Sequence, residues 1–204
     1  MRTVNFEGAA VAPSKIVCVG RNYVEHIEEL GNEVPAEMVV FNKPNSAITT
    51  ELRSRIDGET LHYEGEIALL IQSGDIAAVG FGLDLTRREL QSRLKEKGLP
   101  WERAKAFDGA ALFSEFVRCP SDTTSLGLRL TVDGQTRQRS GVDHMIYPPD
   151  VILRELQRFT TLEDGDIVMT GTPGGVGAII AQTLFRGAVL SGDRELVSAS
   201  WLAR

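Results

Sequence analysis

Residues 61–71 read LHYEGEIALLI, and the interpretation of the whole chain begins with this stretch. Side chains two apart in a strand point the same way, so His62, Glu64 and Glu66 would share one face, opposite Tyr63 and the apolar residues. Two neighbouring carboxylates repel each other, at little cost if their face is solvated. A half-exposed strand with acidic residues outside is therefore one interpretation, since charged side chains are mostly exposed.

The residues after Glu66 favour a different interpretation. IALLI is continuously apolar rather than alternating, which indicates that both faces become buried. A buried carboxylate has to be protonated, paired or bound to a metal. The next apolar run, AAVGFGLDL at 77–85, could pair with this strand and bring Asp84 to it. Oxygen ligands select hard cations, so Mg²⁺, Mn²⁺ or Ca²⁺ would fit such a group.

Length and composition predict a single domain over residues 1–204. The chain has 42% hydrophobic residues, enough for one substantial core. Its two cysteines, Cys18 and Cys119, lack metal-ligand spacing and are expected to be ordinary thiols.

The charge and the apolar pattern exclude several classes of partner. A formal net charge of -6 argues against a protein that neutralises nucleic-acid phosphates. No stretch approaches the roughly 20 apolar residues needed to cross a bilayer, and the first 15 residues lack the pattern of a secretory leader. We expect a soluble, cytoplasmic protein whose partner is a small molecule, with no nucleic-acid or membrane contact.

The pattern of elements predicts a mainly β fold with short helices, of the α+β class, without regular βαβ alternation. Asp133-Gly134 between alternating residues predicts a hairpin. Thr86 to Glu89 match a capping box that would open a helix to about Gly98, Asn22 could cap an earlier helix, and Pro149 could open a later one. Further strands are expected at 15–19, 37–44, 166–171, 183–190 and 195–203.

Six motifs, in this order, resemble the fumarylacetoacetate hydrolase family, particularly its small members acting on acylpyruvates and oxaloacetate. The resemblance implies a mixed β-roll, a homodimer, and Mg²⁺ or Mn²⁺ held by Glu64, Glu66 and Asp84. The motifs are GRNYVEHIEELGNEVP (20–35), FNKP (41–44), HYEGE (62–66), LDLTRRELQ (83–91), WERAKAFD (101–108) and GTPGGVG (171–177).

The same resemblance implies catalytic roles for three residues. His26 and Glu29 are three apart, so on a helix they share a face, where the carboxylate would orient the imidazole. In similar enzymes this pair activates the attacking water; the alternative is a solvated histidine on a surface helix. Lys105, together with Lys43, would supply positive charge near the substrate carboxylate or the developing oxyanion, although lysines are usually exposed.

Five further residues are candidates for substrate binding. Arg88 and Gln91 could meet the substrate from one helix face, with Arg21 nearby, although an ordinary helix-surface role is equally compatible with the sequence. Gly171 and Thr172 open GTPGGVG, which could present backbone N–H groups and a hydroxyl to a carboxylate. A plain glycine turn is the alternative, and no Lys-Ser or Lys-Thr follows to make a P-loop.

These expectations define a leading function and two alternatives. The leading one is a divalent-metal enzyme that acts on 2-oxo acids through a metal-stabilised enolpyruvate, by hydrolysing acylpyruvates or by decarboxylating or tautomerising oxaloacetate. The second is an isomerase or decarboxylase of the 2-hydroxyhepta-2,4-diene-1,7-dioate type. The third is a catalytically silent binding relative, favoured if short segments near 73–80 and 113–125 distort the site.

Overall fold

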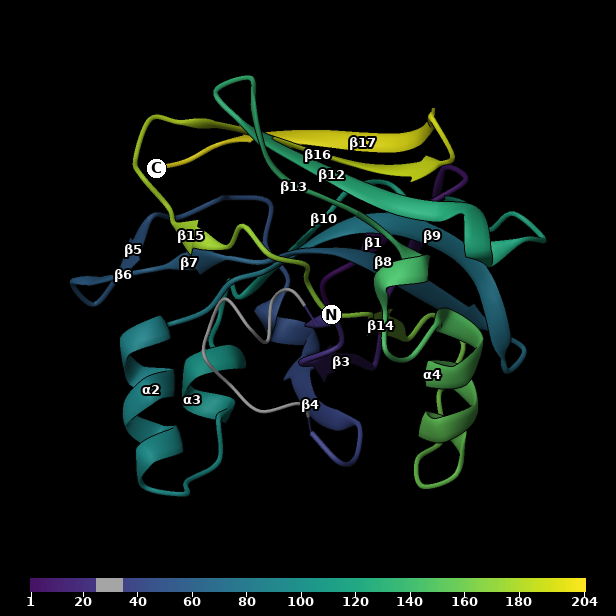
Figure 1. The fold of residues 1–204 in the computed structure, drawn as a ribbon, viewed down its shortest axis with the longest axis horizontal. Coiled ribbons are helices and arrows are strands. Elements are labelled where there is room, and N and C mark those ends of the chain that lie inside the picture. Colours follow the sequence, from purple (N-terminus) through teal and green to yellow (C-terminus); the bar gives the residue numbers. More distant parts are fainter. Residues whose placement is uncertain (25–34) are drawn as a thin grey trace.

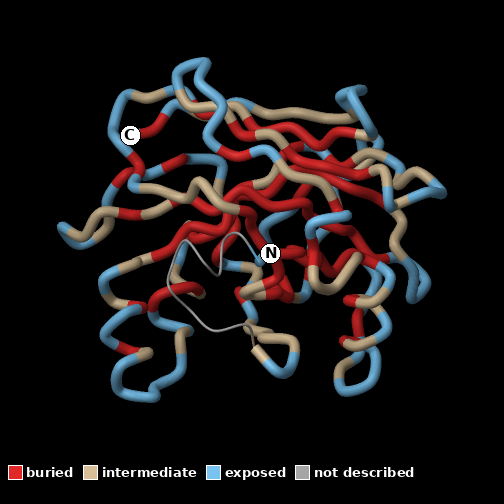
Figure 2. The backbone as a smooth tube through the Cα atoms, in the orientation of Figure 1, coloured by how far each residue is buried: buried red, intermediate tan, exposed pale blue. Residues whose placement is uncertain are grey.

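The computed structural model describes residues 1–24 and 35–204, and it is mainly β with a few short helices, as the sequence predicts. A four-stranded sheet lies across a larger, curled sheet, and the helices α2, α3 and α4 lie on the opposite side of that larger sheet (Figure 1). Buried backbone is concentrated in the two sheets, while the helices are largely exposed (Figure 2). Within the described residues, no helix has the length and apolar character that a membrane span requires.

The larger sheet has the strand order β10-β9-β8-β14-β3-β4. Only β3 and β14 run parallel, and the remaining neighbours are antiparallel. Both faces of its central strands are covered, which explains their continuous apolar runs. Its strands are β3 (Lys15–Gly20), β4 (Val39–Pro44), β8 (Gly65–Gln72), β9 (Asp75–Asp84), β10 (Ala111–Phe113) and β14 (Ile167–Met169), with β11 (Val117–Arg118) paired to β9.

The β8–β9 hairpin confirms the pairing predicted for 61–71 and 77–85. Its two turn residues, Ser73 and Gly74, have φ of 54° and 77°, typical of a tight two-residue hairpin turn. The first strand is interrupted at Glu64, so β7 (His62–Tyr63) is separate from β8. The register puts Gly65 opposite Leu83, and the Asp84 N–H donates to the Glu64 carbonyl at 2.9 Å.

The second sheet has the order β13-β12-β16-β17. The predicted Asp133-Gly134 hairpin joins β12 to β13, and both turn residues have positive φ. The Asp133 carboxylate also accepts a hydrogen bond from the Leu184 N–H at 2.8 Å, which joins the turn to the neighbouring strand. Its strands are β12 (Leu126–Val132), β13 (Gln135–Gly141), β16 (Leu184–Ser191) and β17 (Arg194–Leu202).

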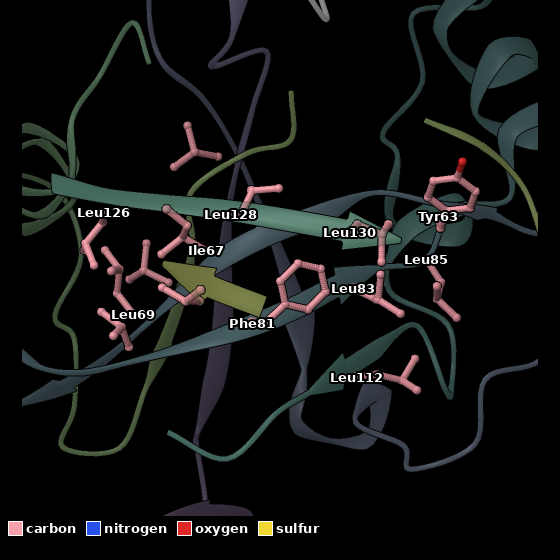
Figure 3. Close-up of a cluster of buried hydrophobic side chains, with 14 of the residues drawn as sticks. Tyr63, Ile67, Leu69, Phe81, Leu83, Leu85, Leu112, Leu126, Leu128 and Leu130 are labelled. Carbon is pink, nitrogen blue, oxygen red and sulfur yellow. The ribbon is translucent and has the colours of Figure 1, made fainter. Parts of the chain in front are cut away.

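The main core lies between the two sheets (Figure 3). Phe81 of β9 packs directly on Gly187 of β16, where an added Cβ would lie 2.1 Å from the ring. Tyr63 meets Phe185 edge to face, with ring centroids 5.2 Å apart. The strand that carries Asp84 is thus fixed by dense packing on its far side.

Short elements complete the described fold. They are β1 (Val4–Phe6), β2 (Ala9–Val11), β5 (Arg55–Ile56), β6 (Glu59–Thr60), β15 (Gly177–Ala178), three 3-10 turns η1 (Asn45–Ala47), η2 (Thr123–Ser125) and η3 (Val142–His144), and the helices α2 (Arg88–Glu96), α3 (Glu102–Lys105) and α4 (Pro149–Gln157).

The predicted start of α2 needs a correction. The helix forms, but Arg87 rather than Thr86 is its N-cap residue, and the Thr86 hydroxyl instead accepts a hydrogen bond from Lys105 Nζ at 2.7 Å. Glu59 takes over this role from β6: its carboxylate accepts from the Leu90 N–H at 3.0 Å and from Arg87 Nε at 2.7 Å. Pro149 opens α4 as predicted.

The helix predicted after Asn22 falls mostly on residues 25–34, outside the described residues. Asn22 itself is fully buried. Its amide donates to the Tyr147 and Thr170 carbonyls at 3.0 and 2.8 Å, and its Oδ1 accepts from the Tyr147 N–H at 2.8 Å. These contacts fix the backbone just after Arg21 against β14 and the segment before α4.

Candidate metal centre and substrate pocket

Three acidic side chains converge at one end of the β8–β9 hairpin, where they line a pocket. Each offers a carboxylate oxygen, and the three oxygens lie within 4.8 Å of one another. The side chains belong to Glu64, Glu66 and Asp84, which are 6%, 2% and 1% exposed. The first of these precedes β8, the second lies within it, and the third ends β9. The half-exposed acidic strand is therefore excluded.

Two buried lysines offset part of the negative charge of this group. Lys105 Nζ lies 2.8 Å from Glu64 Oε2 and 2.8 Å from Asp84 Oδ2. Lys43 Nζ lies 2.8 Å from the other oxygen of Asp84, behind the group. Neither lysine is solvated, so the ordinary surface role does not apply to them. Burial of several like charges is tolerated only with counter-charges of this kind.

The donor set fits a hard divalent cation. It contains only carboxylate oxygens, the ligands that Mg²⁺, Mn²⁺ and Ca²⁺ prefer over the sulfur and imidazole of zinc sites. No donor among the described residues is aligned to hydrogen-bond Asp84 Oδ1, although Lys43 lies close to it. The buried Asp84 Oδ1 can therefore still accept a hydrogen bond or bind a cation. The Lys105 ammonium already lies between the carboxylates of Glu64 and Asp84, which shows that positive charge is favourable there.

The electrostatics of the group favour a bound cation. Burial raises the pKa of Glu66 well above its usual value, and the neighbouring Asp84 and Glu64 carboxylates raise it further. The Lys105 pKa is lowered by burial, but Asp84 and Glu64 outweigh that effect and raise it overall. Lys105 is consequently an ammonium ion at neutral pH, able to stabilise negative charge but not to act as a base.

The Gly171–Thr172 loop contacts the acidic group from β14. The Gly171 N–H donates to Glu66 Oε2 at 2.7 Å. Gly171 has φ of 96°, and an added Cβ would lie 2.8 Å from the Asn22 Cβ, so only glycine fits here. Thr172 is buried and donates its hydroxyl proton to the Gly65 carbonyl at 2.9 Å. The loop is therefore part of the site and more than a plain turn.

The pocket above the acids is walled by α2, α3 and β4. Arg88 pairs with Glu64 and donates to Gln91 Oε1 at 2.7 Å, so both predicted helix residues face the pocket. Lys95 and Trp101 line the outer part, with the ammonium 5.7 Å from the ring centroid. Phe41 of β4 lies next to Trp101, with ring centroids 6.3 Å apart, and its ring centroid is 5.3 Å from the Lys105 ammonium.

Comparison with known proteins agrees with this geometry. The family model described as "Fumarylacetoacetate (FAA) hydrolase C-terminal" matches residues 15–201. The chain belongs to the fumarylacetoacetate hydrolase family.

Within this family the chain resembles enzymes of oxaloacetate. It is 40% identical over 198 residues to oxaloacetate tautomerase YcgM of Escherichia coli, covering 86% of this chain and 89% of that protein. It is 35% identical over 182 residues to the mitochondrial oxaloacetate decarboxylase of Dictyostelium discoideum, covering 81% of this chain and 84% of that one.

A solved family structure supports the fold and carries a metal ion. The fumarylpyruvate hydrolase of Pseudomonas aeruginosa, in complex with Mn²⁺ and pyruvate, superposes with a TM-score of 0.86 at 32% identity. The match covers 99% of this chain and 96% of that one. The mainly β family fold inferred from the motifs is thus confirmed.

Most of the site residues expected from the family motifs come together around one pocket. The exceptions are informative: Lys43 is fully buried behind Asp84 and contacts backbone carbonyls of Leu85 and Lys105, so it supports the acid and does not reach the pocket. Gly171 does not line the pocket either, and its N–H, expected to meet a substrate carboxylate, donates to Glu66 instead. His26 and Glu29 lie outside the described residues. The pocket is lined by Arg21, Glu64, Glu66, Asp84, Arg88, Gln91, Lys105 and Thr172.

Four site residues have no counterpart in the sequence-based expectations. Lys95 and Trp101 follow in the same α2–α3 segment, and a helical projection of Arg88 and Gln91 could have included Lys95. Phe41 lies two residues before Lys43 in FNKP. Gln138 lies in QTRQRSG, a polar stretch with no signal of burial, yet it is only 1% exposed and bonded to Thr172.

Proposed function

We propose that this chain is a divalent-metal-dependent enzyme of 2-oxo acids whose preferred reaction is keto–enol exchange of oxaloacetate. The buried group of Glu64, Glu66 and Asp84 beside a cation-rich pocket is the observation that carries the proposal. The YcgM relative, named an oxaloacetate tautomerase, supports the choice of substrate and reaction. Glu64, Glu66 and Asp84 would hold Mg²⁺ or Mn²⁺, with Ca²⁺ as a possible substitute.

The charges of the pocket favour a substrate with two carboxylates. Among the described residues that line it, four are cationic and three acidic, so one positive charge is in excess before an ion binds. A dication adds two more. A dianion such as oxaloacetate offsets this excess better than a monoanionic acylpyruvate does.

Different side chains of the pocket would bind the two carboxylates of the substrate. Arg88 and Gln91 form a hydrogen-bonded pair on one face of α2, and the guanidinium suits a carboxylate. Lys95, at the outer end of the same helix, would meet the second carboxylate. The neighbouring aromatic rings of Phe41 and Trp101 also line the pocket, and their apolar surface would exclude water and strengthen these interactions.

Enolisation requires stabilisation of the negative charge that develops on the 2-oxo oxygen. The Lys105 ammonium, held in place by Glu64, Asp84 and Thr86, is oriented before the reaction and can stabilise that charge. When bound, the metal ion would supply a Lewis acid for the same charge. The predicted His26–Glu29 pair would move the proton, or activate water in a hydrolytic reaction.

A direct comparison of reactions tests the proposal. Purified protein would be assayed for keto–enol exchange and decarboxylation of oxaloacetate and for acetylpyruvate hydrolysis, each with Mn²⁺, with Mg²⁺ and with EDTA. We expect metal-dependent tautomerisation to be the fastest. Faster acylpyruvate cleavage would assign the chain to the hydrolases, in line with its structural neighbour. Activity on the dienedioate alone would favour the isomerase, and no activity would favour a silent relative.

Three accompanying proposals concern the domain, the assembly and the location of the chain. Residues 1–204 are proposed to form one catalytic domain, which includes the family match over 15–201. A homodimer is proposed, with molar mass by light scattering as its test. A cytoplasmic location is likewise proposed, and fractionation of cells that express the tagged protein would test it.

A further inference from the structure

Gln138 connects two parts of the acidic site without lining the pocket. It lies on β13, in the second sheet, and is 1% exposed. Its Oε1 accepts from the Gly65 N–H at 2.9 Å. Its Nε2 donates to Thr172 Oγ1 at 2.8 Å and to the Pro173 carbonyl at 2.9 Å. A buried amide needs such partners, and this set fixes which end is oxygen and which is nitrogen.

These bonds close into a ring. The Gly65 N–H donates to Gln138, Gln138 donates to the Thr172 hydroxyl, and that hydroxyl donates to the Gly65 carbonyl at 2.9 Å. Both backbone polar groups of Gly65 are therefore used. Because Gly65 lies between Glu64 and Glu66, the ring fixes the orientation of the peptide planes that aim the two carboxylates.

The packing around the ring leaves little room for adjustment. An added Cβ on Gly65 would lie 2.9 Å from Gln138 Oε1 and 3.0 Å from the Phe81 ring. An added Cβ on Gly175 would lie 2.1 Å from the carbonyl of Arg137. β13 thus lies directly against both the acidic strand and the loop whose Gly171 N–H bonds Glu66.

Simple core filling does not account for this side chain. β13 is an edge strand, and Gln138 is its one buried residue. An apolar residue would fill the same space without having to satisfy the hydrogen-bonding groups of an amide. The amide of Gln138 is better explained by its hydrogen bonds, which hold Gly65 and the Thr172 loop in fixed positions.

We propose that Gln138 is a positioning residue for the metal centre, orienting Glu64 and Glu66 together with the 171–174 loop. The inference rests on the proposed metal centre. Partners of this kind, one step away from the ligands, typically change metal affinity by about 10–100-fold when they are lost.

The test measures Mn²⁺ binding by the metal-free protein in the absence of substrate, by electron paramagnetic resonance of free Mn²⁺. Gln138→Met and Thr172→Val each open the ring, and each should raise the Kd for Mn²⁺ by about 10–100-fold. Thr172→Ser keeps the hydroxyl and should retain wild-type affinity. The double variant should bind no more weakly than the weaker single variant, because one break already opens the ring.

Gln157→Met is the matched control. Gln157 also donates its amide, at 2.7 Å, to the Gly74 carbonyl, but in an exposed turn remote from the acids. Loss of this hydrogen bond in Gln157→Met should leave the Kd for Mn²⁺ unchanged. If Gln138→Met does not fold, Gln138→Glu keeps an acceptor for Gly65, removes the donor to Thr172, and should show the same weakening.

Two results would overturn the inference alone. One is a lower Tm of the metal-free Gln138 variants with an unchanged Kd for Mn²⁺, which would make Gln138 a packing residue. The other is a double variant whose losses in affinity multiply, which would show that the two side chains act separately. A wild-type protein that binds no Mn²⁺ would overturn the metal centre itself, and the two failures are thereby distinguished.

Discussion

Lys105 Nζ lies 2.8 Å from Asp84 Oδ2, and both side chains are almost completely buried. The contact puts a permanent positive charge inside the acidic group on which the proposed activity depends. Lys43 contacts the other oxygen of the same carboxylate at 2.8 Å. The fold therefore tolerates buried acids without a metal, since lysines already offset part of their charge.

Replacing Lys105 should weaken the metal-free protein. Lys105→Met leaves Glu64 and Asp84 without their shared counter-charge, and loss of one member of a buried ion pair costs about 3–5 kcal/mol. Mn²⁺ should restore part of the lost stability because it binds the folded state only. Thermal unfolding in EDTA and in Mn²⁺ measures both effects. Lys97→Met, at an exposed position, is the control; equal Tm losses with and without Mn²⁺ would contradict the expectation.

Glu66→Gln should remove metal binding while preserving the fold. The amide oxygen can still accept from the Gly171 N–H, and a buried charge is lost. Since the Glu66 pKa is raised by burial and by the neighbouring acids, ionised Glu66 destabilises the metal-free protein at neutral pH. We expect an unchanged or higher Tm, no Mn²⁺ binding and no metal-dependent turnover. The exposed Glu89→Gln should behave as wild type, and full activity of Glu66→Gln would refute the ligand assignment.

Lys95→Met should change the choice of substrate. If Lys95 binds the second carboxylate, kcat/KM for oxaloacetate should fall about tenfold, equivalent to roughly 1.4 kcal/mol for one charge-assisted hydrogen bond. Acetylpyruvate lacks that carboxylate and should be little affected. Steady-state assays of both substrates give the ratio, and Arg93→Met on the exposed side of α2 is the control. Equal losses for the two substrates would argue against this role.

Asp166 should make stability depend on pH. It accepts from the Ser14 and Lys15 N–H groups at 3.0 and 3.1 Å and from Lys15 Nζ at 2.5 Å. Burial alone would raise the Asp166 pKa, but the bonds to Lys15 and Ser14 outweigh it and lower the pKa below its usual value. The stabilisation is therefore present above the unfolded pKa of about 3.9 and is lost as pH falls through the lower folded value.

Asp166→Asn should accordingly lower the free energy of unfolding at pH 7 by about 1–3 kcal/mol. The difference from wild type should shrink as pH falls below about 4, because Asp166 of the unfolded chain then takes up a proton, and it should disappear below the lower folded pKa. Denaturant unfolding between pH 3 and 7 would show this. Asp193→Asn, at a fully exposed position, provides the comparison; a difference that stays constant with pH would speak against the assignment.

The sequence predicted the features that depend on local pattern. Alternation and continuous apolar runs gave the β8–β9 hairpin and brought Glu64 and Glu66 next to Asp84, because strand register follows from side-chain periodicity. The predicted capping box failed for a long-range reason. Thr86 matches the local motif, but its hydroxyl accepts a hydrogen bond from Lys105, 19 residues later. Glu59, on another strand, accepts from the Leu90 N–H at the start of the helix instead.

Depth in the fold was harder to predict than proximity in the chain. Lys43 and Lys105 look alike in sequence, yet one lies behind Asp84 and the other faces the pocket. Gln138 is separated from Gly65 by 73 residues, and its strand is otherwise solvated or half-buried. Neither periodicity nor spacing reports a contact between two sheets, so the ring around Gly65 becomes visible only in the folded chain.

The pocket has walls of two kinds. Glu64, Glu66 and Asp84 stand on strands locked by contacts such as that of Phe81 with Gly187, whereas Lys95 and Trp101 belong to an exposed helical segment with few such restraints. Mutations in that outer segment can be accepted without disturbing the acids. Proteins that descend from one ancestor could therefore acquire new substrates through substitutions in the segment of Lys95 and Trp101, while the acidic group and its reaction stay the same.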